Sequence, residues 1–139
     1  MLRVVKVRLY PNKEQQTLIH KTFGSCRFVY NKMLDSKIKA HKNDIKISTY
    51  ELKKTLVPMK KEENTKFLSE VDSTALQNSV LNLDKSYKNF FRRVKLGEKS
   101  GFPKFKSKHN SQQSYQTSTA KIKNAKLYLP IIGEVKTKF

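Results

Sequence analysis

The stretch from Ser69 to Lys106 constrains the fold of this chain more than any other part of its sequence. Its apolar residues recur at three- and four-residue steps, the spacing of one face of an α-helix. These residues are Leu76, Val80, Leu83, Tyr87, Phe90 and Val94. Asp72 or Ser73 can cap the start of the helix, and Leu96-Gly97 is expected to end it. The pattern therefore predicts a long helix with one buried stripe.

A second face of this predicted helix carries amide and basic side chains. They are Asn78, Asn82, Lys85, Lys88, Asn89 and Arg92. Asn is unfavourable in a helix interior, so three of them on one helix need an explanation. One explanation is a solvent-exposed face that tolerates them. The other is a face that binds phosphates, riboses or base edges, since an amide offers both a donor and an acceptor.

A basic segment, Lys99–Lys108, follows the helix and contains no acidic residue. Its lysines can neutralise phosphates, and an exposed Phe between them can stack on a base. The lysines concerned are Lys104, Lys106 and Lys108. Alternatively, the segment is a strand whose Phe102 and Phe105 enter a core, and both descriptions can hold in part.

The composition of the whole chain points to a polyanionic partner. Its 30 Lys and Arg against 11 Asp and Glu give a net charge of +19, and nucleic acid is the expected counterpart. A membrane surface is the alternative, but the sequence has no lipidation signal and no long apolar run. The 139 residues, 37% of them hydrophobic, allow one ordinary domain or two small ones.

Alternation of apolar and polar residues predicts strands at both ends of the chain. Residues 2–10 are the first, and Pro11 ends it. Near the other end, Asn124-Ala125 is the expected turn of a hairpin within Lys121–Ile132, and Gly133 begins a last alternating segment. Residues 109–119 are polar enough for a flexible loop, although Tyr115 to Thr117 could begin a strand.

The first helical segments surround a Gly-Ser dipeptide. One helix is expected from Lys13 to Phe23, with Asn12 and Gln15 forming a capping box at its start. Gly24-Ser25 is expected to break or kink it, and a second helix runs from Cys26 to His41. Two helices around such a turn are typical of a helix-turn-helix, and also of bundles that never touch DNA.

A shorter helix is expected from Tyr50 to about Lys60, where Pro58 cuts it short. Glu62 to Asn64 then opens a loop or short turn, with Phe67-Leu68 as its apolar anchor. Thr74 and Gln77 are candidates for another capping box. With strands at both ends and helices between, the expected fold is α+β: a small β-barrel closed by strands from both ends, with a helical insert.

No catalytic constellation can be assembled from this sequence. Cys26 is the only cysteine and is expected to pack in the core. The histidines are isolated, and there is no Gly-rich phosphate loop or nucleophile motif. A metal-dependent nuclease needs converging carboxylates, yet only Glu134 follows Glu98. We therefore expect a chain that binds without cutting and needs no metal or other cofactor.

Four blocks of the sequence resemble the amino-terminal part of TnpB proteins: RLYPNKEQQTLIHKTFGSCRFVYNKML, LSEVDSTALQNSVLNLDKSYKNFFRRVK, GFPKFKSK and LYLPIIGEVKTKF. These OrfB-type insertion-sequence transposases are RNA-guided DNA nucleases. The resemblance implies a wedge barrel interrupted by a helical recognition lobe. Residues 1–11 would be a wedge strand, and 12–97 the recognition insert, whose part 12–42 carries a helix-turn-helix label in the family. Residues 98–139 would be wedge strands of an incomplete barrel.

The resemblance also implies the partners: a structured guide RNA and duplex DNA with a short transposon-adjacent motif. The EVDSTALQN block matches the helix start that faces this motif, although the family often has Lys at the place of Ser73. SYQT matches a strand of the family that approaches DNA. The implied DNA-binding residues are Tyr50, Ser73, Gln77, Thr117 and Thr119. The wider nucleic-acid-binding set is Arg27, Asn31, Asn78, Asn82, Lys85, Lys88, Asn89, Arg92, Lys104, Lys106, Lys108 and Tyr115.

The catalytic Asp and Glu residues of the family and its CxxC zinc pairs lie downstream of the KTKF block. The resemblance thus implies a truncated, nucleic-acid-binding fragment without the RuvC-like nuclease, in the cytoplasm and associated with the nucleoid. Two other interpretations stay open. The chain could be an independent helix-turn-helix regulator, or a remnant without a function.

Overall fold

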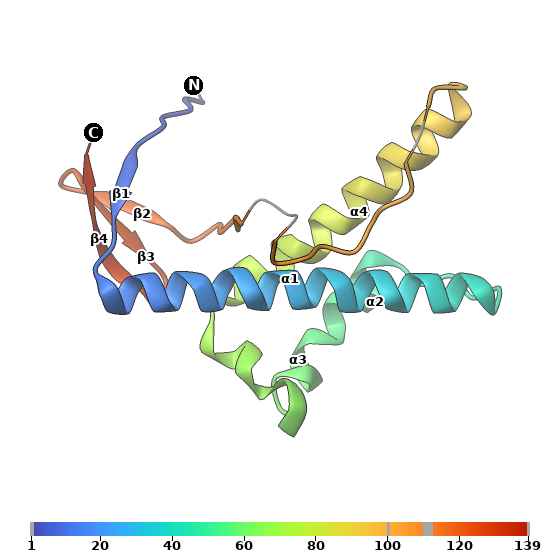
Figure 1. Cartoon of the computed structure of the whole chain (residues 1–139), viewed down its shortest axis with the longest axis horizontal. Coiled ribbons are helices and arrows are strands. Elements are labelled where there is room, and N and C mark those ends of the chain that lie inside the picture. Colours follow the sequence, from blue (N-terminus) through green and yellow to red (C-terminus); the bar gives the residue numbers. More distant parts are fainter. Residues whose placement is uncertain (1, 100, 110–112, 139) are drawn as a thin grey trace.

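The computed structural model describes residues 2–99, 101–109 and 113–138, and shows an α+β fold built along one long helix (Figure 1). The described elements are β1 (Arg8–Tyr10), α1 (Lys13–Lys42), α2 (Thr49–Lys54), α3 (Leu56–Met59), the 3-10 helix η1 (Glu63–Glu70), α4 (Ser73–Lys95), β2 (Lys121–Lys123), β3 (Lys126–Leu129) and β4 (Gly133–Lys138). The sheet lies at the N-terminal end of α1 (Figure 1). α3 and η1 lie on one side of α1, and the second half of α4 extends on the other (Figure 1).

α1 is a single helix of 30 residues, so the predicted break at Gly24-Ser25 is wrong. Gly24 does not have a positive φ, and a Cβ there would meet only Arg27 Nη2, at 3.8 Å. A helical Gly costs roughly 1 kcal/mol relative to Ala. Burial of the next helical turn, Cys26 and Val29, outweighs that cost. Residues 12–42 therefore contain no helix-turn-helix, while the capping box of Asn12 and Gln15 is confirmed.

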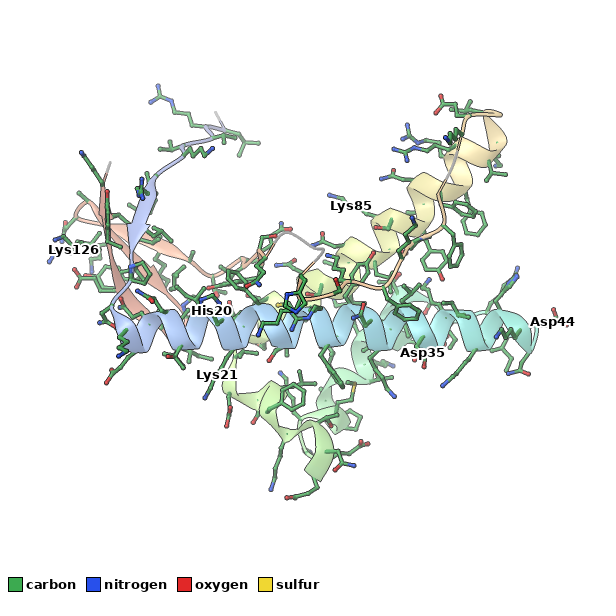
Figure 2. All side chains as sticks on the ribbon, viewed as in Figure 1. His20, Lys21, Asp35, Asp44, Lys85 and Lys126 are labelled. Carbon is green, nitrogen blue, oxygen red and sulfur yellow. The ribbon has the colours of Figure 1, made fainter. Side chains whose placement is uncertain are left out.

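α4 is the long helix that the apolar periodicity predicts. Asp72, one of the two expected caps, accepts a hydrogen bond from the backbone N–H of Thr74, and Gly97 follows the last turn with φ +69°. Because Asp72 is the cap, Thr74 lies inside the helix and the predicted box of Thr74 and Gln77 is not the cap. The second half of α4 projects from the molecule, and Lys85 points away from α1 (Figure 2).

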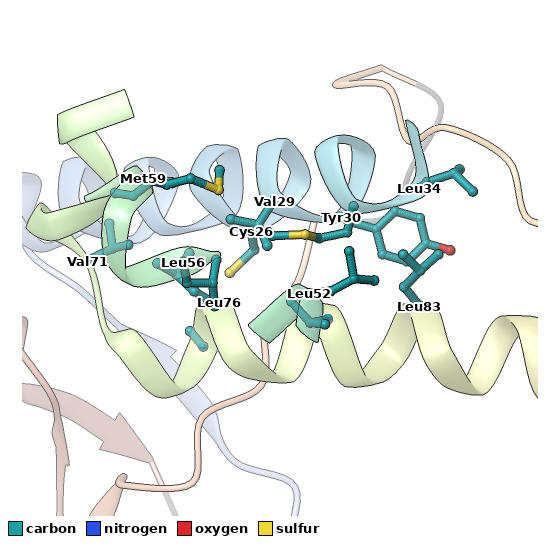
Figure 3. Close-up of a cluster of buried hydrophobic side chains, with 14 residues drawn as sticks. Cys26, Val29, Tyr30, Leu34, Leu52, Leu56, Met59, Val71, Leu76 and Leu83 are labelled. Carbon is teal, nitrogen blue, oxygen red and sulfur yellow. The ribbon is translucent and has the colours of Figure 1, made fainter. Parts of the chain in front are cut away.

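The core forms where α1, α2, α3, η1 and the first half of α4 meet (Figure 3). Its fully buried side chains are Val29, Met33, Leu34, Leu68, Leu76, Val80 and Leu83. Cys26 belongs to this cluster, which confirms its predicted packing role. Burial also raises the pKa of its thiol, so the group stays protonated near neutral pH.

The predicted helix from Tyr50 to Lys60 is two short helices, α2 and α3, separated at Thr55. The Thr55 hydroxyl donates to the Leu52 carbonyl at 2.6 Å, which occupies that carbonyl at the end of α2. The apolar residues expected to point inward, Leu52, Leu56 and Met59, are buried. The loop or short turn predicted from Glu62 is η1, a 3-10 helix of eight residues.

The sheet is open, with the strand order β1-β4-β3-β2 and antiparallel pairing throughout. The predicted barrel is therefore not closed by the described residues, in which β1 and β2 are the two edges. The hairpin prediction is confirmed. Asn124 and Ala125 join β2 to β3 with φ values of 53° and 60°, the signature of a tight hairpin turn, and Ile122 lies opposite Leu127.

The first strand is shorter than the predicted 2–10. β1 pairs with β4 from Arg8, opposite Lys138, to Tyr10, opposite Lys136. Residues before Arg8 have no strand beside them among the described residues, so Val4 and Val5 are exposed. A strand needs a neighbour for its backbone groups, and alternation alone does not supply one.

The described residues 101–109 and 113–119 form a segment that we call the strap. It runs back from the end of α4, contacts α1 at Asn31 and continues toward the sheet on the same side of α1 as α4 (Figure 1). The strap contains no strand in the part that the structure describes, so the possible strands at Lys99–Lys108 and at Tyr115 to Thr117 are wrong. Part of the predicted loop, residues 110–112, lies outside the described residues.

Candidate nucleic-acid interface

The strap is fixed to α1 by Asn31, a residue predicted to contact nucleic acid. Asn31 Nδ2 donates to the carbonyl of Lys106, and the N–H of Lys106 donates to Asn31 Oδ1, both at 2.8 Å. One amide thus satisfies both backbone groups of a strap residue, as a neighbouring strand would. The side chain of Asn31 is engaged inside the protein, and its role is to hold the strap.

A second attachment joins the strap to the first turn of α4. The hydroxyl of Thr117 donates to one carboxylate oxygen of Asp72, while the hydroxyl of Thr74 donates to the other at 2.9 Å. The hydroxyls of Thr74 and Thr117 lie 2.9 Å apart, and the Thr119 hydroxyl lies 3.3 Å from that of Thr117. Thr117 and Thr119 are therefore brought beside the start of α4, where the implied DNA-reading residue Ser73 is exposed.

Asn78 extends this attachment by one helical turn. Its Nδ2 donates to the carbonyl of Gln116 at 3.0 Å and to the Ser118 hydroxyl at 3.4 Å. An Asn in the interior of α4 is thus explained by the strap, which needs a donor at that place. Of the predicted amide face, Asn78 points toward the protein.

A cavity of about 180 Å³ lies between α1, α4 and the strap. It brings together four residues of the predicted binding set, Arg27, Asn82, Lys106 and Tyr115. The rings of Tyr115 and Phe23 meet edge to face, with centroids 5.8 Å apart. Burial raises the pKa of the Tyr115 hydroxyl, and the charge of Asp72 adds to that rise, so Tyr115 stays neutral.

The remaining predicted residues of α4 form an exposed stripe on the outside of the helix. They are Ser73, Gln77, Lys85, Lys88, Asn89 and Arg92. The face predicted as one surface therefore divides in two. Asn78 and Asn82 face the strap, whereas this stripe faces solvent.

Asp84 connects α4 to α2 in the middle of the helix. Its carboxylate accepts a hydrogen bond from the Thr49 hydroxyl at 2.6 Å and pairs with Lys88 at 2.9 Å. Partial burial opposes ionisation, but the hydrogen bonds from Thr49 and Lys88 outweigh it and lower the pKa of Asp84. Of the six exposed residues of the stripe, Lys88 is thus partly neutralised.

Tyr50 follows Thr49 on α2 and is 67% exposed, with Lys54 Nζ 4.6 Å from its ring centroid. The anchor of Thr49 on Asp84 lies about three helical turns beyond Ser73. Among the described residues no hydrogen bond joins Tyr50 to Ser73 or Gln77. The implied DNA-reading set is therefore brought together at Ser73, Gln77, Thr117 and Thr119, with Tyr50 on a separate element.

The strap lysines differ in their surroundings. Lys106 Nζ lies 4.2 Å from the ring centroid of Tyr30, a cation–π contact that holds the ammonium against α1. Lys104 and Lys108 are exposed. Phe102 packs edge to face against Tyr87 and Phe90 but remains 44% exposed, and Phe105 is 55% exposed. Neither Phe enters the core, and only the ring contacts of Phe102 agree with the packing alternative.

Charge is unevenly distributed between the two sides of α1. Residues 85–109, in α4 and the strap, carry nine Lys and Arg and one acidic residue, Glu98. Residues 55–70, which include α3 and η1, carry three Lys and three Glu. The side of α4 and the strap is therefore the one that favours a polyanion.

Sequence reasoning missed the residues that attach the strap. Asp72 was expected only as a cap, although its carboxylate accepts a hydrogen bond from Thr117 of the strap. The available signal was the excess of Asn in helix interiors. This excess indicated that the Asn side chains have polar partners, but it could not show that the partners of Asn31 and Asn78 lie in the strap of the same chain.

Within the described ranges no three His, Cys, Asp or Glu side chains gather where they could hold a metal ion. None of the described helices combines the length and the apolar character needed to span a bilayer.

Comparisons with known proteins agree with the resemblance found in the sequence. Residues 1–46 match the family described as the OrfB (IS605) helix-turn-helix domain. A Streptomyces pristinaespiralis protein named "Putative RNA-guided DNA endonuclease" is 35% identical over 135 residues, which are 95% of this chain and 32% of that protein. The Escherichia coli (strain K12) protein named "Putative RNA-guided DNA endonuclease InsQ" is 30% identical over 135 residues, with the same two shares.

A third relative is of similar length to this chain. "Virulence protein VsdF" of Salmonella dublin is 39% identical over 117 residues, which are 78% of this chain and 96% of that protein. The chain thus spans about a third of the two relatives named as endonucleases and nearly the whole of the third. In this chain, the segment that matches the helix-turn-helix family folds as β1 followed by α1, with no turn between two helices.

Proposed function

The chain belongs to the OrfB (TnpB) family and corresponds to the amino-terminal part of its longer members, and we propose a function from this premise. The proposed function is the binding of nucleic acid through α4 and the strap. The proposed partners are a structured RNA and a duplex DNA that carries a short motif. The proposal covers binding alone. The cleavage activity in the names of the two longer relatives is not carried over to these residues.

The observation that carries this proposal is the concentration of positive charge on one side of the molecule. Nine Lys and Arg within residues 85–109 are accompanied by a single acidic residue. Nucleic-acid affinity comes largely from counterions that Lys and Arg release from the phosphates. A surface of this kind supports phosphate binding along the outer stripe of α4 and along Lys104 and Lys108.

The proposed DNA-reading surface lies at the start of α4. Ser73 and Gln77 are exposed there, and the strap brings Thr117 and Thr119 beside them. Hydroxyl and amide groups of this kind can bind base edges in a groove. The N-terminus of a helix also attracts phosphate, but here the Asp72 carboxylate already accepts from that turn. Base edges rather than a phosphate are therefore the proposed ligand of this end.

The proposed RNA-binding surface is the second half of α4 together with the strap. Lys85, Asn89 and Arg92 lie on the exposed stripe, and Phe91 is 58% exposed beside them. Cations next to exposed aromatic rings suit a strand whose bases are partly unstacked. Tyr50, on α2, is kept as a proposed contact to DNA without a geometric link to Ser73.

Fluorescence anisotropy with the full chain tests the proposal. The probes are a structured RNA hairpin and a randomised DNA duplex, each titrated at several salt concentrations. We expect binding whose logarithm falls linearly with the logarithm of salt concentration. Sequencing of the bound duplexes is expected to show a short motif that Ser73→Ala and Gln77→Ala relax. Absence of binding to both probes at low salt would contradict the proposal.

A further inference from the structure

The cavity between α1, α4 and the strap holds polar side chains without partners. Arg27 enters it from α1 and Asn82 from α4. Within residues 2–99, 101–109 and 113–138, neither side chain forms a hydrogen bond or an ion pair. The neighbouring positions differ: Asn31 and Asn78 each bind the strap backbone. The fold thus uses Asn31 and Asn78 to hold the strap and leaves Arg27 and Asn82 available inside the cavity.

These two side chains are half-buried. No side-chain nitrogen or oxygen of the described residues is both buried and without a partner, so the polar atoms of Arg27 and Asn82 are open to solvent and free to bind a ligand. The guanidinium of Arg27 offers several N–H donors in a planar fork, and the amide of Asn82 offers an NH₂ donor and an oxygen acceptor. This combination suits a ligand with an anionic group and a hydrogen-bonding edge.

The third wall of the cavity is aromatic. Phe23 and Tyr115 meet there edge to face, so a flat ring can pack against either of them. A volume of about 180 Å³ is below the roughly 300–1,000 Å³ of sites for drug-sized ligands. The space therefore suits a single planar group.

We infer that this cavity receives one unpaired nucleotide of the bound strand. Its base would pack on the Tyr115 or Phe23 ring, its edge would bind the amide of Asn82, and an adjacent phosphate would bind Arg27. The inference rests on the proposed nucleic-acid binding and adds a receptor for one base. The ligand chemistry is a nucleobase with its phosphate, which RNA and single-stranded DNA share.

A fully paired duplex would not use the cavity, because its bases are stacked and paired. Extruding one costs a few kcal/mol, least where the nucleotide is already unpaired. The cavity would therefore add affinity for single strands, bulges and loops over duplex. This difference separates it from the phosphate-binding stripe, which duplexes and single strands share.

The test compares a single-stranded oligonucleotide that contains one 2-aminopurine, made as RNA and as DNA, with the fully paired duplex of the same sequence. For the wild-type full chain we expect the 2-aminopurine fluorescence of a single-stranded form to be quenched on binding, as the base packs on a ring. Asn82→Ala and Tyr115→Leu are each expected to weaken binding of that single strand roughly tenfold. Duplex binding is expected to stay unchanged in both variants.

Arg27→Met is expected to weaken binding and to lower the salt slope for a single strand by about 0.7, as loss of one phosphate contact requires. Lys61→Met removes the same charge from an exposed position between α3 and η1 and is the matched control. It is expected to bind like the wild type. The experiment is run with RNA and with single-stranded DNA. The strand whose binding is weakened by the variants is the one that supplies the nucleotide.

Photocrosslinking keeps the inference testable if a variant fails to fold. A single strand with 4-thiouridine or 4-thiothymidine is irradiated on the wild-type chain, and the crosslinked peptides are mapped. Crosslinks at Phe23 or Tyr115 support the inference. If both single strands and the duplex bind while the variants match the wild type and no crosslink reaches these residues, the cavity inference fails and the proposed function stands. If nothing binds, the proposed function fails with it.

Discussion

The two halves of α4 share one sequence pattern and have different surroundings. In the first half, Leu76, Val80 and Leu83 are almost wholly buried against α1, α2 and η1. In the second half the same periodicity continues, yet Tyr87 and Phe90 are only half-buried and Val94 is 52% exposed. The helix therefore carries an apolar stripe beyond the end of the core. Periodicity predicts which face is apolar, and only the neighbouring elements decide whether it is covered.

The difference also separates stability from binding. Exposed aromatic residues rimmed by cations are typical of interaction surfaces, whereas a fully buried stripe is typical of a core. Tyr87, Phe90 and Phe102 form a small aromatic cluster that covers part of the second half. We therefore expect the buried stripe of the first half to carry the free energy of folding and the second half to carry most of the phosphate binding.

Matched truncations provide the sharpest test. Leu76→Ala removes a fully buried side chain and is expected to lower the free energy of unfolding by about 2–5 kcal/mol. Val94→Ala in the second half is expected to cost less than about 0.5 kcal/mol. Urea unfolding followed by circular dichroism measures both. Equal losses in the two variants would show that the second half is covered in solution.

Local patterns predicted the elements that local chemistry determines. The apolar steps from Leu76 to Val94 predicted α4, and Asn124-Ala125 predicted the hairpin turn, because each requires only residues adjacent in sequence. Gly24-Ser25 misled because helix propensity is a weak term that core packing around Val29 overrides. The predicted strand is wrong for residues 2–7, because a strand also needs a neighbouring strand to pair with its backbone.

The candidate site was predicted less well than the fold, because its geometry depends on long-range contacts. Asn31 and Lys106 are 75 positions apart, and Asp72 and Thr117 are 45 apart. No local pattern reports such a contact. The residue pattern and the family resemblance proposed the binding side chains as one set, and the structure divides that set into residues that hold the strap, residues that line the cavity and residues that face solvent.

The second test compares the removal of three cations from the proposed surface with the removal of three cations elsewhere. Lys85→Gln, Arg92→Gln and Arg93→Gln together remove three cations from the second half of α4, and are expected to weaken duplex binding at least roughly tenfold while lowering the salt slope by about two to three. Lys60→Gln, Lys61→Gln and Lys66→Gln remove three cations from the segment that follows α3 and includes η1. This control is expected to bind within a factor of about three of the wild type, since its charges lie away from the proposed surface. Equal losses would mean that net charge alone attracts nucleic acid.

The strap attachment can be weakened without touching either half of α4. Asn31→Ala removes both hydrogen bonds to Lys106, each worth about 1 kcal/mol. We expect amide exchange at Lys106 to accelerate by about tenfold or more while global unfolding changes little. Hydrogen exchange measured by NMR resolves this amide. Asn43→Ala, which removes a bond to the Lys39 carbonyl at the end of α1, is the matched control and should leave Lys106 unchanged.

A smaller effect is expected from Gly24→Ala in α1, the helix on which the first half of α4 packs. The backbone of Gly24 is helical and has room for a methyl group, so the variant is expected to raise the free energy of unfolding by about 0.5–1 kcal/mol. Urea unfolding measures it. A loss of stability would instead indicate a turn at this position and would restore the helix-turn-helix interpretation.

The smallest effect concerns Asp84, which lies where the two halves of α4 meet. Hydrogen bonds from Thr49 and Lys88 lower its pKa in the folded chain below the value of 3.8 for an unperturbed Asp. A carboxyl with a lowered folded-state pKa stabilises the fold above its unfolded-state pKa, and this contribution is lost as pH falls through the folded-state pKa. Acidification from pH 5 to pH 2 should therefore shift the urea midpoint more in the wild type than in Asp84→Asn.

Glu63→Gln changes an exposed pair with Lys66 and should keep the wild-type pH dependence of the urea midpoint, because exposed pairs contribute little. Since the Thr49 bond joins Asp84 to α2, Thr49→Val should reproduce part of the Asp84→Asn result. If it does not, Lys88 rather than α2 holds this carboxylate, and the boundary between the covered and the projecting half lies before Asp84.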